Sequence, residues 1–295
     1  MKSVATQAPE PLTVPHTEIT KRTQSRFRPV LHKGCHLAYQ IQGSGPPVVL
    51  IQGVGVHGGA WAPQISALAP HYECLWFDNR GLGRSQPLGT RLTLEQMAED
   101  TLALMDAQGW ASAHLVGHSM GGLIALHAAL SARERVRSLS LLCSFPHGRD
   151  ATRLTPWMMW TGLRTRIGTR PQRRKAFLEI VMPPSALREA NHVTLASELA
   201  PLFGHDLADQ PPVVMKQLPA MVRYNATPRL HELAGLPTLV VSAEHDRIAP
   251  VAIGKAMAAA IPGARFVEIP DASHGASLQY PDRINALLLH HLREN

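Results

Sequence analysis

The chain has 295 residues, of which 45% are hydrophobic and 17% are charged, a composition typical of a globular protein that buries a large core. No window reaches the roughly 18 consecutive apolar residues of a membrane-spanning helix, so no membrane partner is expected. The 29 Lys and Arg residues outnumber the 22 Asp and Glu residues by seven, a surplus that by itself permits a polyanionic partner.

The positive surplus is confined to two segments. Residues 1–36 carry six basic and two acidic side chains, residues 146–232 carry twelve and seven, and the rest carries eleven and thirteen. The second segment contains a basic run without an acid: Arg164, Arg166, Arg170, Arg173, Arg174 and Lys175. Such a run is usually a solvated helix face, with a carboxylate-bearing substrate as the alternative. No aromatic residues interleave it, so no nucleic-acid partner is expected.

The cysteines and the start of the chain indicate the compartment. Cys35, Cys74 and Cys143 are far apart and odd in number, which argues against a disulfide framework or a zinc site and favours a reducing environment. Residues 1–30 are rich in polar residues and proline and lack the apolar stretch of a signal peptide, so they are predicted to form a flexible tail. We therefore expect a cytoplasmic protein.

Beyond this tail, short apolar runs alternate with helical patterns. Strands are predicted at 48–51, 75–77, 114–117, 136–143, 238–242 and 265–269, and helices at 94–105, 120–132, 251–260 and 281–292. Thr93 is the expected cap of the first helix. This alternation predicts an α/β fold with a mostly parallel, doubly wound sheet that is covered by helices on both faces.

Residues 146–232 differ from this pattern. The strand-like runs vanish, and Pro, Arg and Met accumulate in fragments that look helical. We predict a helical cap inserted between two parts of a core, 31–145 and 233–295. Its apolar side chains, including Trp157 and Trp160, are expected to line a pocket for apolar substrates, with a small core of the cap itself as the alternative.

A glycine-flanked serine lies between a predicted strand and a predicted helix. The residues Gly117-His118-Ser119-Met120-Gly121 fit the G-x-S-x-G pattern of a sharp turn, in which the serine adopts a strained backbone conformation and residues two positions away must be small. The turn lifts the serine hydroxyl clear of the sheet, at the start of a helix whose dipole favours negative charge nearby. This context predicts that Ser119 is a nucleophile.

A serine hydroxyl needs a base to accept its proton, and the base needs an acid that fixes its tautomer. Asp246 follows the fifth predicted strand and His274 follows the sixth. Open α/β sheets place ligands at the carboxyl ends of their strands, so both side chains are expected near Ser119. Glu244 is the alternative acid, but its position nearer the strand end leaves it less free to reach the histidine.

These residues and their order resemble the α/β-hydrolase superfamily from about residue 35 to the C-terminus. The elbow at Ser119, the loop at 78–85 and the inserted helices all match the layout of the family, and the similarity is greatest to its esterase, lactonase and carbon–carbon bond hydrolase branch. The resemblance implies an α/β-hydrolase fold with a helical cap. Haloalkane dehalogenases and epoxide hydrolases of the family carry an Asp at the elbow, so the serine argues against both chemistries.

The resemblance also implies an oxyanion hole made by two backbone amides. The amide of Met120 follows the nucleophile, and the amide of Val54 belongs to the loop after the third strand of the family. Relatives usually have His-Gly where this chain has Gln52-Gly53. We expect Gln52, Gly53 and His118 to contact the substrate.

Together these features predict a serine hydrolase that cleaves carboxylic esters or lactones of small, largely apolar molecules through an acyl-enzyme. One alternative is a carbon–carbon bond hydrolase of vinylogous diketones, and another is a slow or non-catalytic ligand-binding protein on the same scaffold. The sixteen histidines include no H-E-x-x-H, and the glycine-rich run at 53–59 lacks the spacing of a nucleotide loop, so neither a metal nor a cofactor is expected.

Overall fold

The structure is a computed structural model that describes residues 28–89, 92–152 and 155–295. Most of the predicted tail, residues 1–27, lies outside this range. The boundary at residue 30 is wrong, because the first strand already begins at Arg28 and pairs in antiparallel register with the second, Val30 opposite Leu37.

One eight-stranded sheet forms the centre of the molecule, in the order β1-β2-β4-β3-β5-β6-β7-β8. The strands are β1 (Arg28–His32), β2 (Cys35–Gln42), β3 (Pro47–Ile51), β4 (Glu73–Phe77), β5 (Ala113–His118), β6 (Val136–Leu142), β7 (Thr238–Ala243) and β8 (Arg265–Ile269). Strands β3 to β8 are parallel, whereas β1 and β2 form an antiparallel edge. Every residue of β5 and β7 is buried, as expected of strands covered on both faces. All six predicted strands are confirmed.

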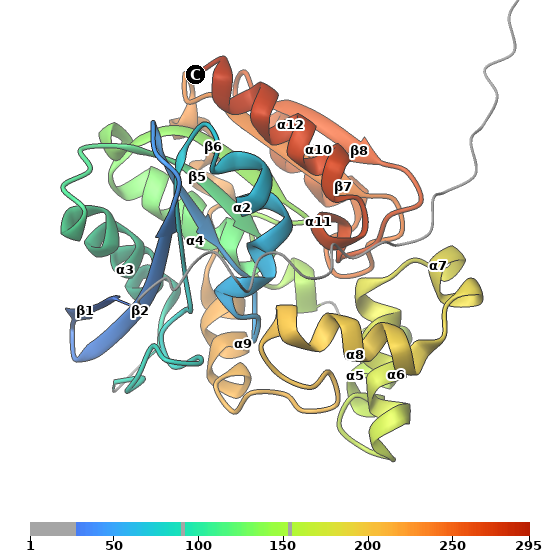
Figure 1. Cartoon of the computed structure of the whole chain (residues 1–295). Helices are drawn as coiled ribbons and strands as arrows, with labels where there is room; N and C mark the ends of the chain where they lie inside the picture. The colour runs from blue at the N-terminus through green and yellow to red at the C-terminus, as the bar shows by residue number, and fades with distance from the viewer. Residues whose placement is uncertain (1–27, 90–91, 153–154) are drawn as a thin grey trace, which may run out of the picture.

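Helices cover both faces of the sheet (Figure 1). The helices of the two core parts are α2 (Ala62–Leu68), α3 (Leu94–Ala107), α4 (Met120–Ser131), α10 (Val251–Ala260), α11 (Ala276–Gln279) and α12 (Pro281–Arg293), with 3-10 turns η1 (Gly58–Trp61) and η2 (Arg133–Arg135). Helices α3, α4 and α10 pack in one apolar cluster with the sheet, and α2 and α12 pack in another. The side chain of Thr93 caps α3 by accepting a hydrogen bond from the amide of Gln96. The predicted doubly wound α/β architecture is confirmed.

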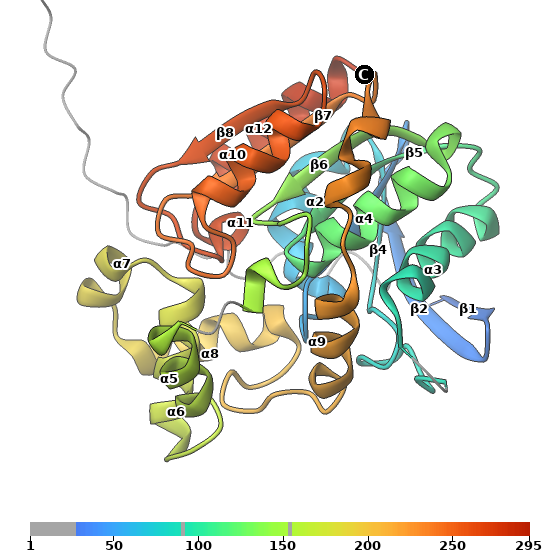
Figure 2. The ribbon, with the colours of Figure 1, turned by 180° about the vertical axis from the view of Figure 1, so that it is seen from behind.

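The segment between β6 and β7 contains helices and, within its described residues, no strand. Its elements are η3 (Asp150–Thr152), α5 (Pro156–Arg164), α6 (Arg170–Val181), α7 (Pro184–Glu189), α8 (His192–Phe203), α9 (Val214–Arg223) and η4 (Thr227–Leu233). Seen from behind, α5 to α8 form a group beside the sheet, while α9 lies nearer to it (Figure 2). Helices α6 and α8 share an apolar cluster of their own, whereas Met221 and Leu230 join the main core. The division of the chain at residues 146 and 232 stays a prediction.

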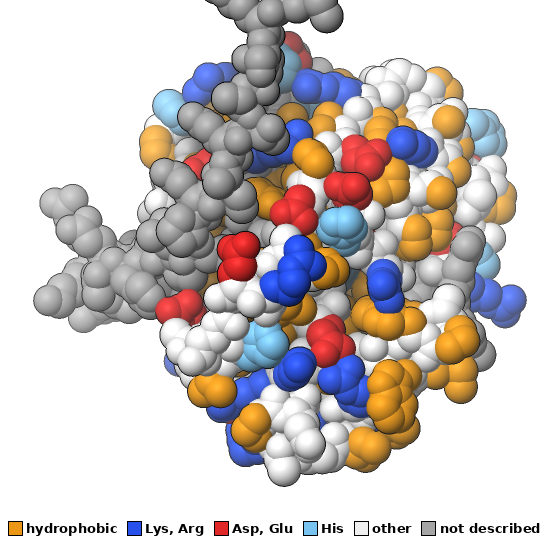
Figure 3. Space-filling view, turned by 90° about the vertical axis from the view of Figure 1, so that its right-hand side faces the viewer, with side chains coloured by type: hydrophobic (Ala, Val, Ile, Leu, Met, Phe, Trp, Pro, Cys, Tyr) orange, Lys and Arg blue, Asp and Glu red, His pale blue; other side chains and the backbone are white. Residues whose placement is uncertain are grey.

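Several features of the described residues bear on binding partners. None of their helices is both long and apolar enough to cross a membrane, and no group of three or more His, Cys, Asp or Glu side chains could hold a metal ion. The three cysteines are free and buried. The face on the side of α7 shows Lys and Arg side chains interspersed with acidic and apolar ones (Figure 3). The described residues visible on that face therefore form no continuous basic surface.

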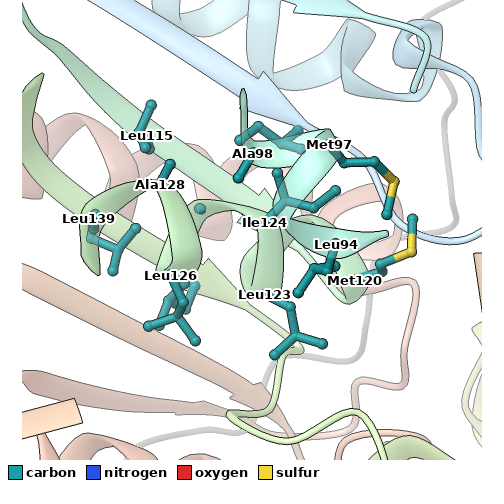
Figure 4. Packing of buried hydrophobic residues seen from close by; sticks show 14 of the residues in the cluster. Leu94, Met97, Ala98, Leu115, Met120, Leu123, Ile124, Leu126, Ala128 and Leu139 are labelled. Carbon is teal, nitrogen blue, oxygen red and sulfur yellow. The ribbon is translucent and has the colours of Figure 1, made fainter. Parts of the chain in front are cut away.

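Helix α4 is packed on every side, and this fixes the residue that precedes it. Leu123, Ile124 and Leu126 are all fully buried, although they point in different directions around the helix. They lie among side chains of α3 and the neighbouring strands, including Met97 and Leu115 (Figure 4). A helix that is apolar all round is stable only inside a protein. The start of α4, where Ser119 lies, is therefore a rigid position.

Candidate active site

The turn between β5 and α4 consists of Ser119 alone. Its φ of 55° and ψ of −121° lie in a region that costs side chains about 1–3 kcal/mol. Glycines at the predicted positions make the turn possible. A Cβ atom on Gly121 would overlap the carbonyl group of Ile51 in β3, and one on Gly117 would overlap the backbone of Gly121. The hydroxyl is thereby held at the carboxyl end of the sheet.

Three side chains from three separate loops meet at this turn. The Nε2 atom of His274 lies 3.0 Å from the Oγ atom of Ser119, and the Nδ1 atom lies 2.8 Å from the Oδ2 atom of Asp246. A carboxylate only accepts hydrogen bonds, so Nδ1 carries the proton and leaves the lone pair of Nε2 facing the hydroxyl. The geometry can therefore transfer the serine proton to the histidine.

The acid of this group is buried and fully hydrogen bonded. Only 3% of Asp246 is exposed, and its Oδ1 atom accepts hydrogen bonds from the amides of Ile248 (2.8 Å) and Ala249 (2.9 Å). Burial acts to raise the pKa of Asp246, but the adjacent His274 and these hydrogen bonds outweigh it and hold the pKa below its ordinary value. The alternative acid, Glu244, is exposed, and its carboxylate accepts from the amide of Asp271 instead.

The loop at Gln52 and Gly53 lies directly against the serine. A Cβ atom on Gly53 would be only 3.0 Å from the Cβ atom of Ser119. Within the described residues, the amide N–H groups of Val54 and Met120 donate to no protein acceptor. The side chain of Gln52 is buried, with its Oε1 atom 3.3 Å from the amide of Gly53. Among the described residues, two unpaired donors thus flank the nucleophile, one in the loop after β3 and one at the start of α4.

Polar side chains that the sequence did not single out support this loop. The Oε1 atom of Gln217, on α9, accepts from the amide of Gly55 at 2.8 Å, and Asn79 donates to the carbonyl of Gln52 at 2.9 Å. Gln217 is fully buried and follows Val214 by three residues on the same helix. A glutamine on the apolar face of a helix was the signal that could have identified it.

An apolar cavity of about 660 Å³ opens next to Ser119. Gln52, Gly53, Val54, His118, Ser119 and His274 line its inner part, and most of the wall is aliphatic or aromatic. Phe177 on α6, Leu218 on α9 and Ile248 in the loop after β7 are examples. Such a lining suits a substrate with an apolar body.

Trp157 and Trp160 do not line this cavity, contrary to the expectation from the sequence. Helix α5 turns Met158 and Leu163 toward the cavity instead. Trp157 lines a second cavity of about 560 Å³, where the guanidinium of Arg247 lies 4.7 Å from its ring centre, and Trp160 is 59% exposed. The sequence indicates correctly that α5 is rich in apolar residues. Which of these residues face the cavity depends on how the helix packs against the rest of the protein.

His118 supports the histidine rather than only lining the cavity. Its Nε2 atom lies 2.8 Å from the backbone carbonyl of His274. A carbonyl oxygen only accepts, so Nε2 carries the proton, while the buried Nδ1 atom has no partner among the described residues. Burial and, to a smaller extent, the nearby His274 lower the pKa of His118 to about 4. The side chain therefore stays neutral at physiological pH.

The replacement His118→Phe is expected to flatten the pH dependence of stability. The folded protein holds the pKa of His118 at about 4, below the value of 6.5 of an unperturbed histidine. Between these two pH values the unfolded chain binds a proton at this histidine and the folded chain does not. The free energy of unfolding of the wild type therefore falls by on the order of 1.4 kcal/mol per pH unit as pH decreases. Urea unfolding between about pH 7 and pH 5 measures this slope. Equal slopes in both proteins would contradict the assignment.

The loop that carries His274 is attached to the inserted helices. The amide of Gly275 donates to the carbonyl of Val181 at 2.9 Å, and the hydroxyl of Ser273 donates to the carbonyl of Ile180 at 3.2 Å. Farther along, the hydroxyl of Ser185 donates to the carboxylate of Asp271 at 2.7 Å. The inserted helices therefore help to fix the position of the histidine.

Comparison with known proteins agrees with the fold. The chain belongs to the alpha/beta hydrolase fold family, whose profile matches residues 46–281. The chain is therefore a hydrolase of this fold, and the resemblance inferred from the sequence is confirmed.

Three relatives illustrate the similarity. A candidate carbamate hydrolase, RutD, from Azorhizobium caulinodans is 30% identical over 263 residues, which cover 88% of this chain and 97% of the relative. The structure of an enol-lactonase from Burkholderia xenovorans superposes with a TM-score of 0.73 at 28% identity, covering 88% and 97% of the two chains. A thermophilic esterase from Thermogutta terrifontis has a TM-score of 0.74 at 27% identity, covering 91% and 97%.

Proposed function

We propose that the protein hydrolyses carboxylic esters or lactones of small, largely apolar molecules. The observation that carries this proposal is the unbroken chain of hydrogen bonds from Ser119 through His274 to Asp246 at the inner end of an apolar cavity. The names of two similar structures, an esterase and an enol-lactonase, support the same class of substrate.

In the proposed reaction, His274 accepts the hydroxyl proton as Ser119 Oγ attacks the ester carbonyl. The amides of Val54 and Met120 stabilise the negative oxygen of the tetrahedral intermediate, and each such donor is worth about 3 kcal/mol. The histidine then gives its proton to the leaving alcohol. A water molecule, deprotonated by the same histidine, releases the acid from the acyl-enzyme, so the cycle needs no cofactor. Asp246 keeps the imidazole in the required tautomer throughout.

A fluorophosphonate probe tests the nucleophile directly. We expect one label per chain on wild-type protein, located on Ser119 by peptide mapping, and no label on Ser119→Ala. Ser277→Ala, which removes another hydroxyl that lines the same cavity, is expected to leave the label in place. Folded wild-type protein that takes up no probe would exclude a serine mechanism. A panel of neutral esters of graded acyl length, run on wild type and Ser119→Ala, then tests turnover.

A carbon–carbon bond hydrolase of vinylogous diketones is the second candidate, because it would use the same three side chains. One observation favours it: a cation, Arg166, lines the cavity, and such diketones are acidic. Direct comparison of a 4-nitrophenyl ester with a ring-cleavage diketone separates the two. Strong stabilisation by a ligand without any turnover would instead indicate a binding protein.

A further inference from the structure

The cavity next to Ser119 has an unusual charge distribution. None of its described lining residues is an Asp or a Glu, and Arg166 is the single Lys or Arg among them. A lone cation in an otherwise apolar, acid-free wall attracts an anion. The positive charge is therefore available to a ligand that enters the cavity.

Most other members of the basic run at 164–175 are neutralised within the inserted helices. Arg164 pairs with Glu179, Arg170 with Asp206 and Asp209, Arg173 with Asp209, and Arg174 with Asp206. Lys175 lines the second cavity instead. Arg166 has no carboxylate partner among the described residues, and its Nη2 atom contacts only the sulfur of Met215, at 3.2 Å. Thioether sulfur is a weak acceptor, so the guanidinium is left with unused donors.

Gln210, another polar residue of the cavity wall, does not present a free donor to a ligand. Its Nε2 atom is buried and has no hydrogen-bond partner within the described parts of the chain. Because this atom has almost no accessible surface, a molecule in the cavity does not reach it. The charge of Arg166 therefore carries the case for a polar subsite in a mostly apolar cavity.

The reacting groups and Arg166 differ in their exposure to solvent. Only 6% of Ser119 and 8% of His274 are exposed, so the reaction takes place at the inner end. Arg166 is exposed and follows the C-terminal end of α5. Leu163 and Phe177 belong to the apolar wall. A matching molecule has a scissile carbonyl inside, an apolar middle part, and an anionic group toward solvent.

We propose that Arg166 forms a subsite for a carboxylate at the end of the substrate that lies farthest from the scissile bond. The proposal rests on the proposed function and narrows its substrate class to apolar esters or lactones with an acidic end. A carboxylate fits because the guanidinium offers a single positive charge and several N–H donors, the combination that binds two carboxylate oxygens.

The test compares 4-nitrophenyl esters that end in a carboxylate with esters of equal length that end in a carboxamide. One series carries the end group on the acyl chain, and a second series carries it on the alcohol, with chain length graded in both. In wild type we expect kcat/KM to favour the carboxylate by about tenfold in one series, mainly through KM and at one optimal length. High salt should reduce this preference, because the subsite is exposed.

The variants separate this subsite from general electrostatics. Arg166→Gln should bring the carboxylate-to-carboxamide ratio close to one, and Arg166→Lys should restore part of it. Arg173→Gln removes an arginine of the same insertion that does not line the cavity, and it should keep the wild-type ratio. A wild-type ratio near one in both series, or an unchanged ratio in Arg166→Gln, would overturn the subsite. Turnover of the carboxamide esters would still support the proposed function.

Discussion

The replacement Asp246→Asn is expected to lower kcat by about 10⁴-fold while KM changes little. Asparagine keeps the size of the side chain but presents an N–H group, which would turn toward the Nδ1 atom of His274. The imidazole proton would then lie on Nε2, so the histidine could no longer accept the proton of Ser119. The amides of Ile248 and Ala249, which now donate to Oδ1, hold the replaced side chain in place and favour this orientation.

Steady-state kinetics on a neutral ester measures this effect. Glu244→Gln is the matched control, because it makes the same chemical change two residues away in the same loop, and its kcat should stay within about threefold of wild type. Thermal unfolding of both variants checks that the fold is intact. Comparable losses in the two variants, or a small loss in Asp246→Asn, would contradict the assigned acid.

The second large effect is on stability. Gly121→Ala is expected to lower the free energy of unfolding by about 3 kcal/mol or more. The added Cβ atom would lie 2.7 Å from the carbonyl carbon of Ile51 and 2.9 Å from the carbonyl oxygen of Gln52. Both contacts are with backbone, which cannot rotate away as a side chain would. The strand end and the oxyanion loop must therefore shift, and activity falls with stability.

Urea unfolding compares this variant with Gly162→Ala. Gly162 lies within α5, and an added Cβ atom there meets nothing within 4 Å. Alanine should therefore stabilise the helix by about 0.5–1 kcal/mol. Opposite signs for the two substitutions are the expected result. A loss below about 1 kcal/mol for Gly121→Ala would mean that the elbow is not tightly packed.

Much of the fold is predictable because the central strands are buried on both faces and appear as apolar runs. The apolar run at 238–242 forms β7 (Thr238–Ala243), and the helix predicted at 251–260 is α10 with the same limits. The antiparallel edge was missed. Strand β2 mixes buried and exposed positions without regular alternation, and β1 continues from a polar segment. Edge strands depend on pairing with a neighbour more than on their own composition.

The reacting side chains are predictable for a different reason. Ser119, Asp246 and His274 each follow a strand. The carboxyl ends of parallel strands lie at the same edge of the sheet, whatever the conformation of the loops. The walls of the cavity lack such a constraint. Whether Trp157 or Met158 faces the substrate depends on a rotation of α5 by about 100° per residue, which docking decides. The unused N–H donors of Arg166 could not be predicted, because the sequence does not show which of the neighbouring basic residues form ion pairs with acidic side chains.

The hydrogen bonds between the loop of His274 and the inserted helices limit how this enzyme can diverge. A recombinant that received foreign helices α6 and α7 would lose the side-chain anchor at Ser185, and it would keep the backbone anchor at Val181 only if the new helix followed the same path. Helix α5 makes no such bond within the described residues, and it supplies four residues of the cavity wall, among them Met158 and Leu163. Changes in substrate preference can therefore accumulate at these four positions, which makes them natural targets for directed evolution, whereas Trp157 of the same helix contacts Arg247 beside Asp246.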